Sequence, residues 1–286
     1  MNVYFRELTI EDIPAINDIS KDIWEGEDYI PHVIQGWLQD ENCMNYGTFT
    51  DETKTNLIGF GRVKLYNKDI AWLEGGRIKV SYQGKGIGKL QLYYAIEYAR
   101  KIGAKVAQYD TSSNNFASIS LAKYYGFKRK KYMELIEFSS QNINLTKRKI
   151  STFEKMSAKE AKKYYTEFDI GPGTEICIGW SYIPLNFITD THGSWKYNED
   201  SILLKIEHII SHGSEVPLKN EIWLISYGNA KAALDLILDT IQEEVQLNAV
   251  FQVFCSPEIA DLLKRMGFKP YNDPRVCVIL FEKSLA

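Results

Sequence analysis

The amino-acid sequence predicts an α/β protein with mixed sheets, organised as two tandem domains of related architecture. Its 286 residues correspond to about two domains. Short strand-like runs alternate with amphipathic helical segments along the first half. The tripeptide Gly126-Phe127-Lys128 recurs as Gly267-Phe268-Lys269, each time after the order helix, strand, helix, which indicates an internal repeat; chance similarity of ordinary α/β elements is the alternative. We therefore expect a first domain over residues 1–140, a linker over 141–148 and a degenerate second domain over 149–286.

Each half of the chain supplies its own series of elements. In the first half, periodicity and turn residues predict a strand at 3–8, then helices ending near Ile23 and Leu38, then strands at 44–50, 57–66 and 70–80. These are followed by a helix at 86–101, a strand at 105–110, a helix ending at Tyr125 and a strand at 131–138. In the second half, a capping box at Ser157 and Glu160 opens a helix. The later elements are a strand at 221–226, a helix at 230–244, a strand at 249–255 and a helix at 257–266.

Composition excludes several classes of protein. A net charge of −3 argues against a general nucleic-acid binder, which is normally basic. No apolar run approaches the ~20 residues of a membrane span, and the first residues lack a secretory signal pattern. The four cysteines never form a C-x-x-C pair, which favours free thiols in a reducing compartment. We expect a cytoplasmic monomer or homodimer without nucleic-acid or membrane partners.

A glycine-rich stretch joins the strand at 70–80 to the helix at 86–101. It contains Gly84, Gly86 and Gly88 at alternate positions, with Lys85 and Lys89 beside them. Glycines allow a tight turn, and the amides of a helix N-terminus bind anions. The stretch therefore predicts a phosphate or pyrophosphate site, although a glycine turn that only connects strand to helix remains an alternative.

The spacing excludes two common nucleotide loops. A Walker A loop needs Gly-Lys followed by Ser or Thr, but Lys89 is followed by Leu90. A dinucleotide fingerprint needs a third glycine where this chain has Lys89. What remains is the pattern Q-x-x-G-x-G, formed by Gln83, Gly86 and Gly88.

This pattern resembles the loop of the GNAT superfamily of acetyl-CoA-dependent N-acetyltransferases. A second family signature, N-x-x-A-x-x-L-Y-x-x-x-G-F, is matched at Asn115, Leu121, Gly126 and Phe127. The resemblance implies a GNAT fold over roughly residues 1–140, with acetyl-CoA as co-substrate. It also implies a set of cofactor-binding residues: Ile78, Lys79, Val80, Gln83, Gly84, Lys85, Gly86, Ile87, Gly88, Lys89 and Asn115.

The resemblance also suggests residues for the chemistry. Family enzymes let an amine attack the thioester directly, with strand amides at Ile78 to Val80 polarising the carbonyl. The base candidate is Glu74, which period-two alternation would place on one face with Gly76, Ile78 and Val80; the alternative is a structural or exposed carboxylate. The family tyrosine position holds Ala122, so Tyr125 is the substitute candidate for the general acid, and solvent is the alternative.

The acceptor site is expected in the loop between the first two helices. Its candidate residues are aromatic or acidic and suit a small cationic or amphipathic amine: Trp24, Glu25, Glu27, Asp28 and Tyr29. A solvated acidic loop is the alternative. The run Asp28-Tyr29-Ile30-Pro31 with Trp37 looks like histidine N-acetyltransferase-type enzymes, which favours an amino-acid-like acceptor.

The second half has the turn Ser226 to Ala230 in place of the glycine loop, so we expect one cofactor per chain. His208 and His212 are spaced to chelate a metal on a helix, but no third ligand accompanies them, and no metal is expected. The sequence predicts an N-acetyltransferase of small amines. The alternative is a non-catalytic acyl-CoA-binding sensor or regulatory protein, which the alanine at position 122 favours.

Overall fold

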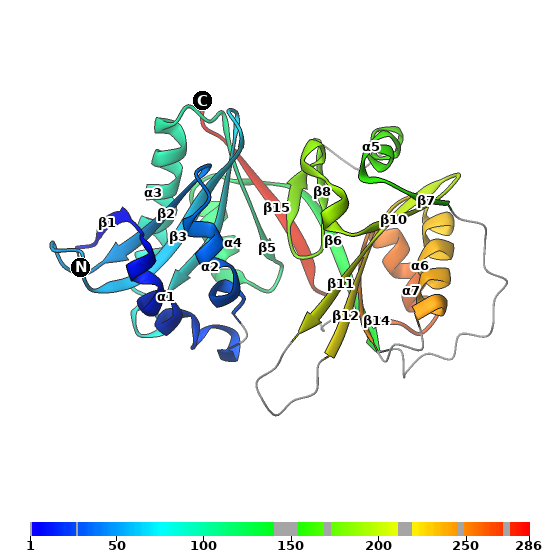
Figure 1. The fold of residues 1–286 in the computed structure, drawn as a ribbon, viewed down its shortest axis with the longest axis horizontal. Helices are drawn as coiled ribbons and strands as arrows, with labels where there is room; N and C mark the ends of the chain where they lie inside the picture. The colour runs from blue at the N-terminus through cyan, green and yellow to red at the C-terminus, as the bar shows by residue number, and fades with distance from the viewer. Residues whose placement is uncertain are drawn as a thin grey trace. The chain divides into compact units, whose positions relative to one another are not determined.

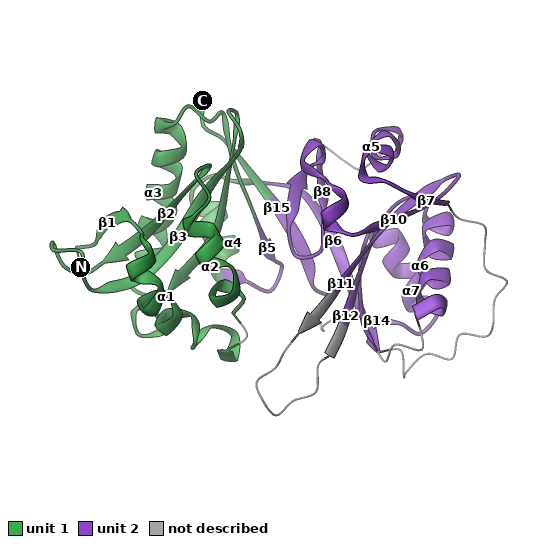
Figure 2. Cartoon of the chain, in the orientation of Figure 1, with its two compact units in different colours: residues 1–109, 117–128, 281–286 green, residues 110–116, 129–280 purple. Residues whose placement is uncertain are grey.

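The computed structural model describes residues 2–26, 28–139, 154–168, 173–210, 219–244, 249–270 and 275–286. The chain forms two compact units (Figure 2). Unit 1 comprises Met1–Tyr109, Ala117–Lys128 and Phe281–Ala286, and unit 2 comprises Asp110–Phe116 and Arg129–Leu280. The expected linker at 141–148 lies outside the described residues.

The elements from Tyr4 to Tyr124 follow the predicted order (Figure 1). They are β1 (Tyr4–Glu7), α1 (Ile13–Ser20), α2 (Ile30–Leu38), β2 (Cys43–Phe49), β3 (Leu57–Asn67), β4 (Ile70–Ile78), α3 (Ile87–Lys101), β5 (Val106–Ser112) and α4 (Phe116–Tyr124). The strands lie in the order β1-β2-β3-β4-β5, with only β4 and β5 parallel among these neighbours. The predicted α/β fold with a mixed sheet is confirmed.

Helices cover both faces of this sheet. Ile16 of α1, Ile34 of α2 and Phe60 of β3 belong to one buried apolar cluster. The adjacent Gly59 faces α3, because a Cβ placed there would lie 2.6 Å from Nε2 of Gln91. Consecutive strand residues point to opposite faces. Therefore α1 and α2 pack on one face of the sheet and α3 packs on the other.

The last residues of the chain complete the sheet of unit 1. In β15 (Cys277–Ser284), Glu282 accepts a hydrogen bond from Gln108 of β5 at 2.7 Å, and the rings of Phe281 and Tyr109 stack with centroids 5.6 Å apart. The amide of Leu285 also donates to the carbonyl of Lys105 at 2.8 Å. The sheet of unit 1 thus includes the end of β15, which is far in sequence from its neighbour β5.

Unit 2 contains the remaining elements. They are β6 (Lys128–Ser139), β7 (Glu154–Met156), α5 (Ala158–Glu167), β8 (Glu175–Cys177), β9 (Tyr182–Pro184), β10 (Ser194–Asn198), β11 (Ser201–Ile210), β12 (Lys219–Gly228), α6 (Ala230–Glu244), β13 (Val250–Cys255), α7 (Pro257–Arg265) and β14 (Lys269–Pro270). The strand order is β6-β13-β12-β11-β10-β7, in which β12 and β13 are parallel. β14 also pairs with β6, and β8 and β9 form a separate two-stranded sheet.

Strand β6, which precedes the expected linker, belongs to unit 2. Its residues Glu134–Ser139 pair with β13 in antiparallel register. Ile136 and Phe138 enter the same buried cluster as Leu236 of α6 and Leu263 of α7. The predicted domains, 1–140 and 149–286, therefore differ from the compact units in the placement of β6 and of the end of β15.

The two Gly-Phe-Lys tripeptides end equivalent helices. Gly126 follows α4 with φ +74°, and Gly267 follows α7 with φ +92°. In each case the next amide reaches back five residues, from Phe127 to Ala122 at 2.9 Å and from Phe268 to Leu263 at 3.1 Å. This is the Schellman motif, in which glycine adopts the left-handed conformation without the steric strain that a Cβ would cause. The recurrence of the tripeptide thus reflects the same helix termination in both halves of the chain.

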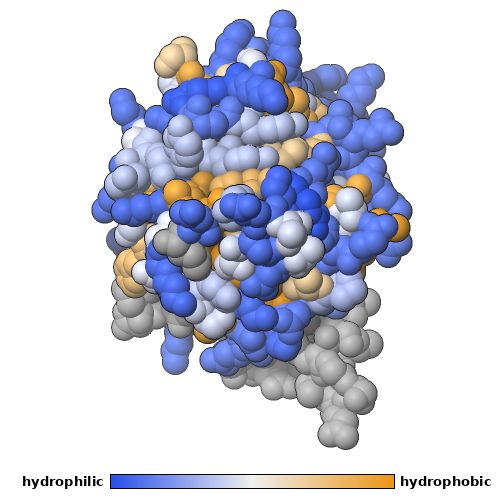
Figure 3. All heavy atoms as spheres, turned by 90° about the vertical axis from the view of Figure 1, so that its left-hand side faces the viewer, coloured by the Kyte–Doolittle hydropathy of each residue, from blue (hydrophilic) through white to orange (hydrophobic). Residues whose placement is uncertain are grey.

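Two features describe the surface. Within the described ranges, no helix is both long and apolar enough to cross a bilayer. On the face shown in Figure 3, hydrophilic residues cover most of the surface, and a band of apolar residues lies between them.

Candidate functional site

The glycine loop lies between the end of β4 and the start of α3, as predicted. Gly84 and Gly86 have φ values of +73° and +79°, so both occupy the left-handed region that favours glycine. Gly86 is the N-cap of α3, and no side chain caps the helix there. The first-turn amides of Ile87 and Gly88 are therefore left for a ligand, at the positive end of a 15-residue helix. This arrangement binds anions.

Two lysines and a glutamine frame the loop. Lys85 donates to the carbonyl of Ser81 at 2.8 Å, and Nζ of Lys89 lies 4.1 Å from the centroid of the Tyr124 ring. Both lysines are exposed, and neither forms an ion pair with a carboxylate of the described residues. Gln83 donates to the carbonyl of Ile78 at 3.1 Å, which fixes the loop to the end of β4. The loop therefore combines backbone donors with accessible positive charge.

The end of β4 has one paired edge. β4 pairs with β5 only at Ile70, Ala71 and Trp72, whereas its pairing with β3 continues to Ile78. The amide of Lys79 donates to the carbonyl of Ile58 at 2.8 Å, on the β3 side. Within the described residues, the opposite edge of β4 beyond Trp72 lacks a β5 partner. Ile78, predicted to bind the cofactor, is the last residue of this edge, whereas Val80, also predicted to bind it, lies beyond the strand in the 3-10 turn Val80–Tyr82.

Asn115 immediately precedes α4, and its amide donates to the carbonyl of Ser112 at 3.0 Å. It belongs to the segment Asp110–Phe116, which groups with unit 2. Its cofactor-binding role remains a prediction.

The base candidate Glu74 is held by an arginine from the neighbouring strand. Oε1 of Glu74 accepts a hydrogen bond from Arg62 at 2.9 Å, and 23% of the Glu74 side chain is exposed. Burial raises the pKa of Glu74, while the charges of Arg62 and Lys64 act in the opposite direction. A carboxylate with a raised pKa is a better proton acceptor at neutral pH than an ordinary one.

A β-bulge places Glu74 on the face covered by α1 and α2. Arg62 pairs with Glu74 but Phe60 pairs with Arg77, so β4 contains one residue more than β3 between these pairs. Gly75 has φ +67° at this point, and a Cβ there would lie 2.5 Å from the Trp37 ring. The expectation that Glu74 shares a face with Ile78 is wrong, because the extra residue reverses the alternation.

The predicted acceptor residues gather around Arg77 of β4. Asp28 is buried and accepts two hydrogen bonds from Arg77, both at 2.9 Å. The guanidinium of Arg77 lies 4.4 Å from the Trp24 ring and 5.5 Å from the Tyr29 ring. Asp28 is therefore neutralised within the protein, and the accessible groups are the aromatic rings, which are 56% exposed at Trp24 and 43% exposed at Tyr29.

The loop that carries these residues has a strained backbone. Trp24 and Glu25 have φ values of +48° and +59°, which non-glycine residues rarely adopt. Such conformations cost of order 1–3 kcal/mol each and often occur at functional sites. Glu25 is exposed beside Trp24. Glu27, the remaining acceptor candidate, lies outside the described residues.

Tyr125 lies beside the first turn of α3. Its hydroxyl donates to the carbonyl of Lys89 at 2.8 Å, and burial raises the pKa of Tyr125. The phenol is therefore protonated at neutral pH, as a proton donor must be. Ala122, at the family tyrosine position, is fully buried.

The corresponding helix of unit 2 has a different N-terminus. The side chain of Asn229 accepts hydrogen bonds from the amides of Lys231 and Ala232, at 3.0 and 3.2 Å, so the first turn of α6 is capped internally. A Cβ at Gly228 would lie 2.3 Å from the carbonyl oxygen of Asp200. This turn has neither the free amides nor the space found at Gly86.

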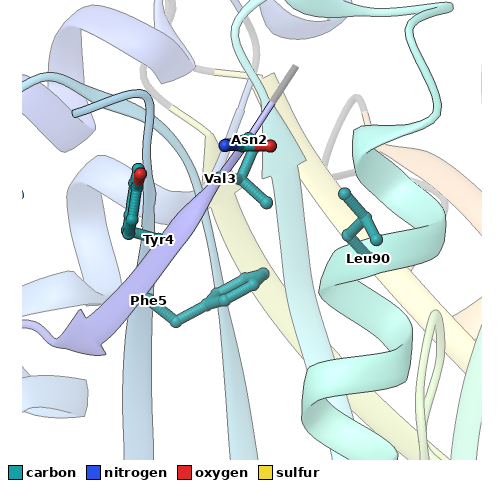
Figure 4. Close-up of a pocket in the computed structure, with 5 residues that line it drawn as sticks. All are labelled: Asn2, Val3, Tyr4, Phe5 and Leu90. Atoms are coloured by element: carbon teal, nitrogen blue, oxygen red, sulfur yellow. The ribbon is translucent and has the colours of Figure 1, made fainter. Parts of the chain in front are cut away.

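A surface hollow of about 420 Å³ is lined by Asn2, Val3, Tyr4 and Phe5 of the β1 region and by Leu90 of α3 (Figure 4), and none of the predicted site residues lines it. Across the described residues, no group of three or more His, Cys, Asp or Glu side chains is placed to hold a metal ion. His212 lies outside them.

Sequence reasoning missed the two arginines that organise the site. Arg62 and Arg77 lie in strands that are otherwise mainly apolar, and such positions seldom hold a charge without a partner. Charged residues in predicted central strands were the available signal.

Known proteins share the fold of this chain and match part of its sequence. Residues 13–127 match the model of the acetyltransferase (GNAT) family. The fold is similar to that of a tandem GNAT protein from the clavulanic acid biosynthesis pathway, with TM-score 0.60, 10% identity, and coverage of 100% of this chain and 99% of that one. It is also similar to a GCN5-related N-acetyltransferase from Kribbella flavida, with TM-score 0.55, 11% identity, and coverage of 99% and 71%. No curated protein matches the sequence significantly.

Proposed function

We propose, from the match of residues 13–127 to the acetyltransferase (GNAT) family model and from the similarity of the whole chain's fold to a tandem GNAT protein, that the protein is an acetyl-CoA-dependent N-acetyltransferase. Its acceptor is a primary amine of a small, amino-acid-like molecule. Free thiols at all four cysteines are compatible with action in the cytoplasm, where we place it.

The uncapped N-terminus of α3 is the observation that carries this proposal. Gly84 to Lys89 supply backbone donors and two exposed lysines, which suit the pyrophosphate of coenzyme A. The edge of β4 that lacks a β5 partner runs from beyond Trp72 to Ile78, shortly before the loop, and it suits the amide-bearing arm and thioester of the same molecule. Since Asn229 caps α6, one such site per chain is proposed.

The residues of unit 1 supply what direct transfer requires. The amine nitrogen forms a bond to the acetyl carbon while the bond from that carbon to sulfur breaks. Glu74 accepts the proton that the amine loses, and strand amides near Ile78 polarise the acetyl oxygen. The sulfur leaves as a thiolate and takes a proton from Tyr125 or from solvent.

The amine reaches Glu74 from the face covered by α1 and α2. Trp24 and Tyr29 present their rings there, and Glu25 adds an exposed carboxylate. Aromatic faces and one carboxylate favour an ammonium group attached to a small organic body. Asp28 supports this surface through Arg77 and does not bind the amine itself.

Thiol release from acetyl-CoA across a panel of amines tests the proposal, with amino acids, small diamines and short peptides as acceptors. We expect turnover on a subset of small amines. Calorimetry should show one coenzyme A bound per chain. Tight binding with no turnover on any amine would instead support the acyl-CoA sensor, the second candidate, which the buried Ala122 at the tyrosine position favours.

A further inference from the structure

Arg62 is the most heavily engaged charged side chain near the proposed base. It is 4% exposed and lies on β3, opposite Glu74 in the strand register. One terminal nitrogen donates to Glu74 at 2.9 Å, and the other donates to Asp40 at 2.7 Å. Its guanidinium also lies 4.6 Å from the centroid of the Trp37 ring. Arg62 therefore joins the base candidate to the end of α2.

Asp40 fixes the orientation of this arginine. The carboxylate of Asp40 accepts hydrogen bonds from the amide of Asn42 at 3.1 Å and from the thiol of Cys43 at 3.0 Å. The amide of Asn42 and the thiol of Cys43 thus fix Asp40. Asp40 and the Trp37 ring in turn fix Arg62, which is hydrogen-bonded to one oxygen of Glu74. A side-chain hydrogen bond with Trp72, a neighbour on β4, also acts on Glu74, so the carboxylate is held from both strands.

We propose that Arg62 is a positioning residue for acetyl transfer, which holds the Glu74 carboxylate ionised and oriented to accept the proton of the acceptor amine. This inference rests on the proposed function, and it adds Arg62 of β3 to the residues of β4 that the proposed function uses.

The charges around Glu74 determine the expected effect of removing Arg62. The groups that face it or lie beside it are Arg62 and Lys64 of β3, Asp40 after α2, Cys43 of β2, and Trp72 and Arg77 of β4. Asp40 is an anion, since its pKa is lowered by the hydrogen bond from Cys43. Cys43 stays neutral, since burial raises its pKa to about 12. Arg62 is thus the cation hydrogen-bonded to Glu74.

Loss of this cation leaves burial and the negative charge of Asp40 acting on Glu74, opposed by the charge of Lys64 and the hydrogen bond with Trp72 but no longer by Arg62. Burial and the charge of Asp40 favour the protonated carboxyl group, so the pKa of Glu74 rises further. A protonated Glu74 does not accept a proton, so activity at neutral pH falls and recovers at alkaline pH. If Arg62 and Glu74 were only a structural ion pair, removing Arg62 would lower the stability of the protein and leave the pH dependence of kcat unchanged.

The test compares pH–rate profiles of the full-length protein with three substitutions. Arg62→Met removes the charge at similar volume, and Arg62→Lys keeps the charge. Arg6→Met is the matched control, because Arg6 also pairs with a carboxylate, Asp12 at 2.7 Å, and lies over a ring, Phe49 at 4.4 Å. We expect Arg62→Met to move the acidic limb of kcat to higher pH by about one unit or more. Arg62→Lys and Arg6→Met should keep the limb near that of the wild type, with coenzyme A affinity unchanged throughout.

An unmoved acidic limb in a folded Arg62→Met protein that binds coenzyme A would overturn the inference. If that variant does not fold, the cycle with Glu74→Gln decides instead. The cycle uses Arg62→Gln, which removes the charge but keeps a polar side chain: it should lower kcat in the wild-type background and cause no further loss in Glu74→Gln if Arg62 acts through Glu74, whereas additive losses would contradict the inference. Failure of the proposed function is distinct, because the wild-type protein would then bind coenzyme A without turning over any amine.

Discussion

The guanidinium of Arg62 donates a hydrogen bond to the carboxylate of Glu74 over 2.9 Å, and the two residues face each other in the register of β3 and β4. The bulge at Gly75 places this pair on the same sheet face as Arg77, around which Trp24 and Tyr29 gather. The proposed proton acceptor and an aromatic surface thus lie on the face covered by α1 and α2. The anion-binding loop follows the end of the same strand.

Gly86→Glu should abolish coenzyme A binding. The new carboxylate would stand at the N-cap of α3, where its bulk and negative charge oppose a phosphate. Gly267→Glu is the matched control, because Gly267 also has a left-handed φ with open space around it but lies at the end of α7. Calorimetry should show loss of binding for Gly86→Glu and wild-type affinity for Gly267→Glu. Equal loss in both variants would indicate strain instead of a phosphate site.

Phe281→Ala should destabilise unit 1, although this residue lies near the end of the chain. Phe281 is buried and stacks on Tyr109 of β5. Removing a buried phenylalanine ring costs about 3–5 kcal/mol. Hydrogen exchange should show lost protection at the amides of β5, and thermal melting should show a lower Tm. Unchanged protection at β5 would contradict the assignment of residues 281–286 to unit 1.

Asn229→Ala should lower stability by about 1 kcal/mol, the usual cost of removing an N-cap side chain. Coenzyme A affinity should not change, since this helix end is capped within unit 2 and is not expected to bind phosphate. Denaturant unfolding and calorimetry measure the two quantities. Weaker coenzyme A binding in this variant would show that α6 contributes to the cofactor site.

The sequence predicts many elements of both units because their signals are local. The glycine loop, Pro31 in the first turn of α2, and the capping box at Ser157 each act within one or two turns of chain, and the structure contains all three. The helix Ala230–Glu244 was predicted with its observed bounds. Local hydrogen bonding and periodicity determine these features, so one stretch of sequence is enough to recognise them.

The features that were missed depend on distant partners. The pairing of β5 with the end of β15 joins residues such as Gln108 and Glu282, and no local pattern indicates it. The bulge in β4 is visible only against the register of β3, although Gly75-Gly76 was a possible signal. Without the bulge, alternation gives the wrong face for Glu74, and the partnership with Arg62 does not follow.

Trp24→Ala should raise KM for the amine by roughly two- to fivefold, which corresponds to the ~0.5–1 kcal/mol of an exposed cation–π contact. Affinity for coenzyme A should stay near that of the wild type, because Trp24 lies on the face opposite α3. Tyr124→Ala is a useful control, since Tyr124 is also exposed but lies on α4 beside Lys89. An unchanged KM in Trp24→Ala would remove the loop of α1 and α2 from the acceptor site.

The initial rate of thiol release from acetyl-CoA, in Glu74→Gln against wild type with the best amine of the panel, tests the central claim most directly. Glutamine keeps the shape of the side chain but does not accept a proton. Since burial raises the pKa of Glu74, the wild-type rate should fall with decreasing pH on an acidic limb above the usual glutamate range. At neutral pH we expect Glu74→Gln to lower kcat by about 100-fold or more, the usual contribution of a general base, with unchanged coenzyme A affinity. A wild-type rate in Glu74→Gln would contradict the account.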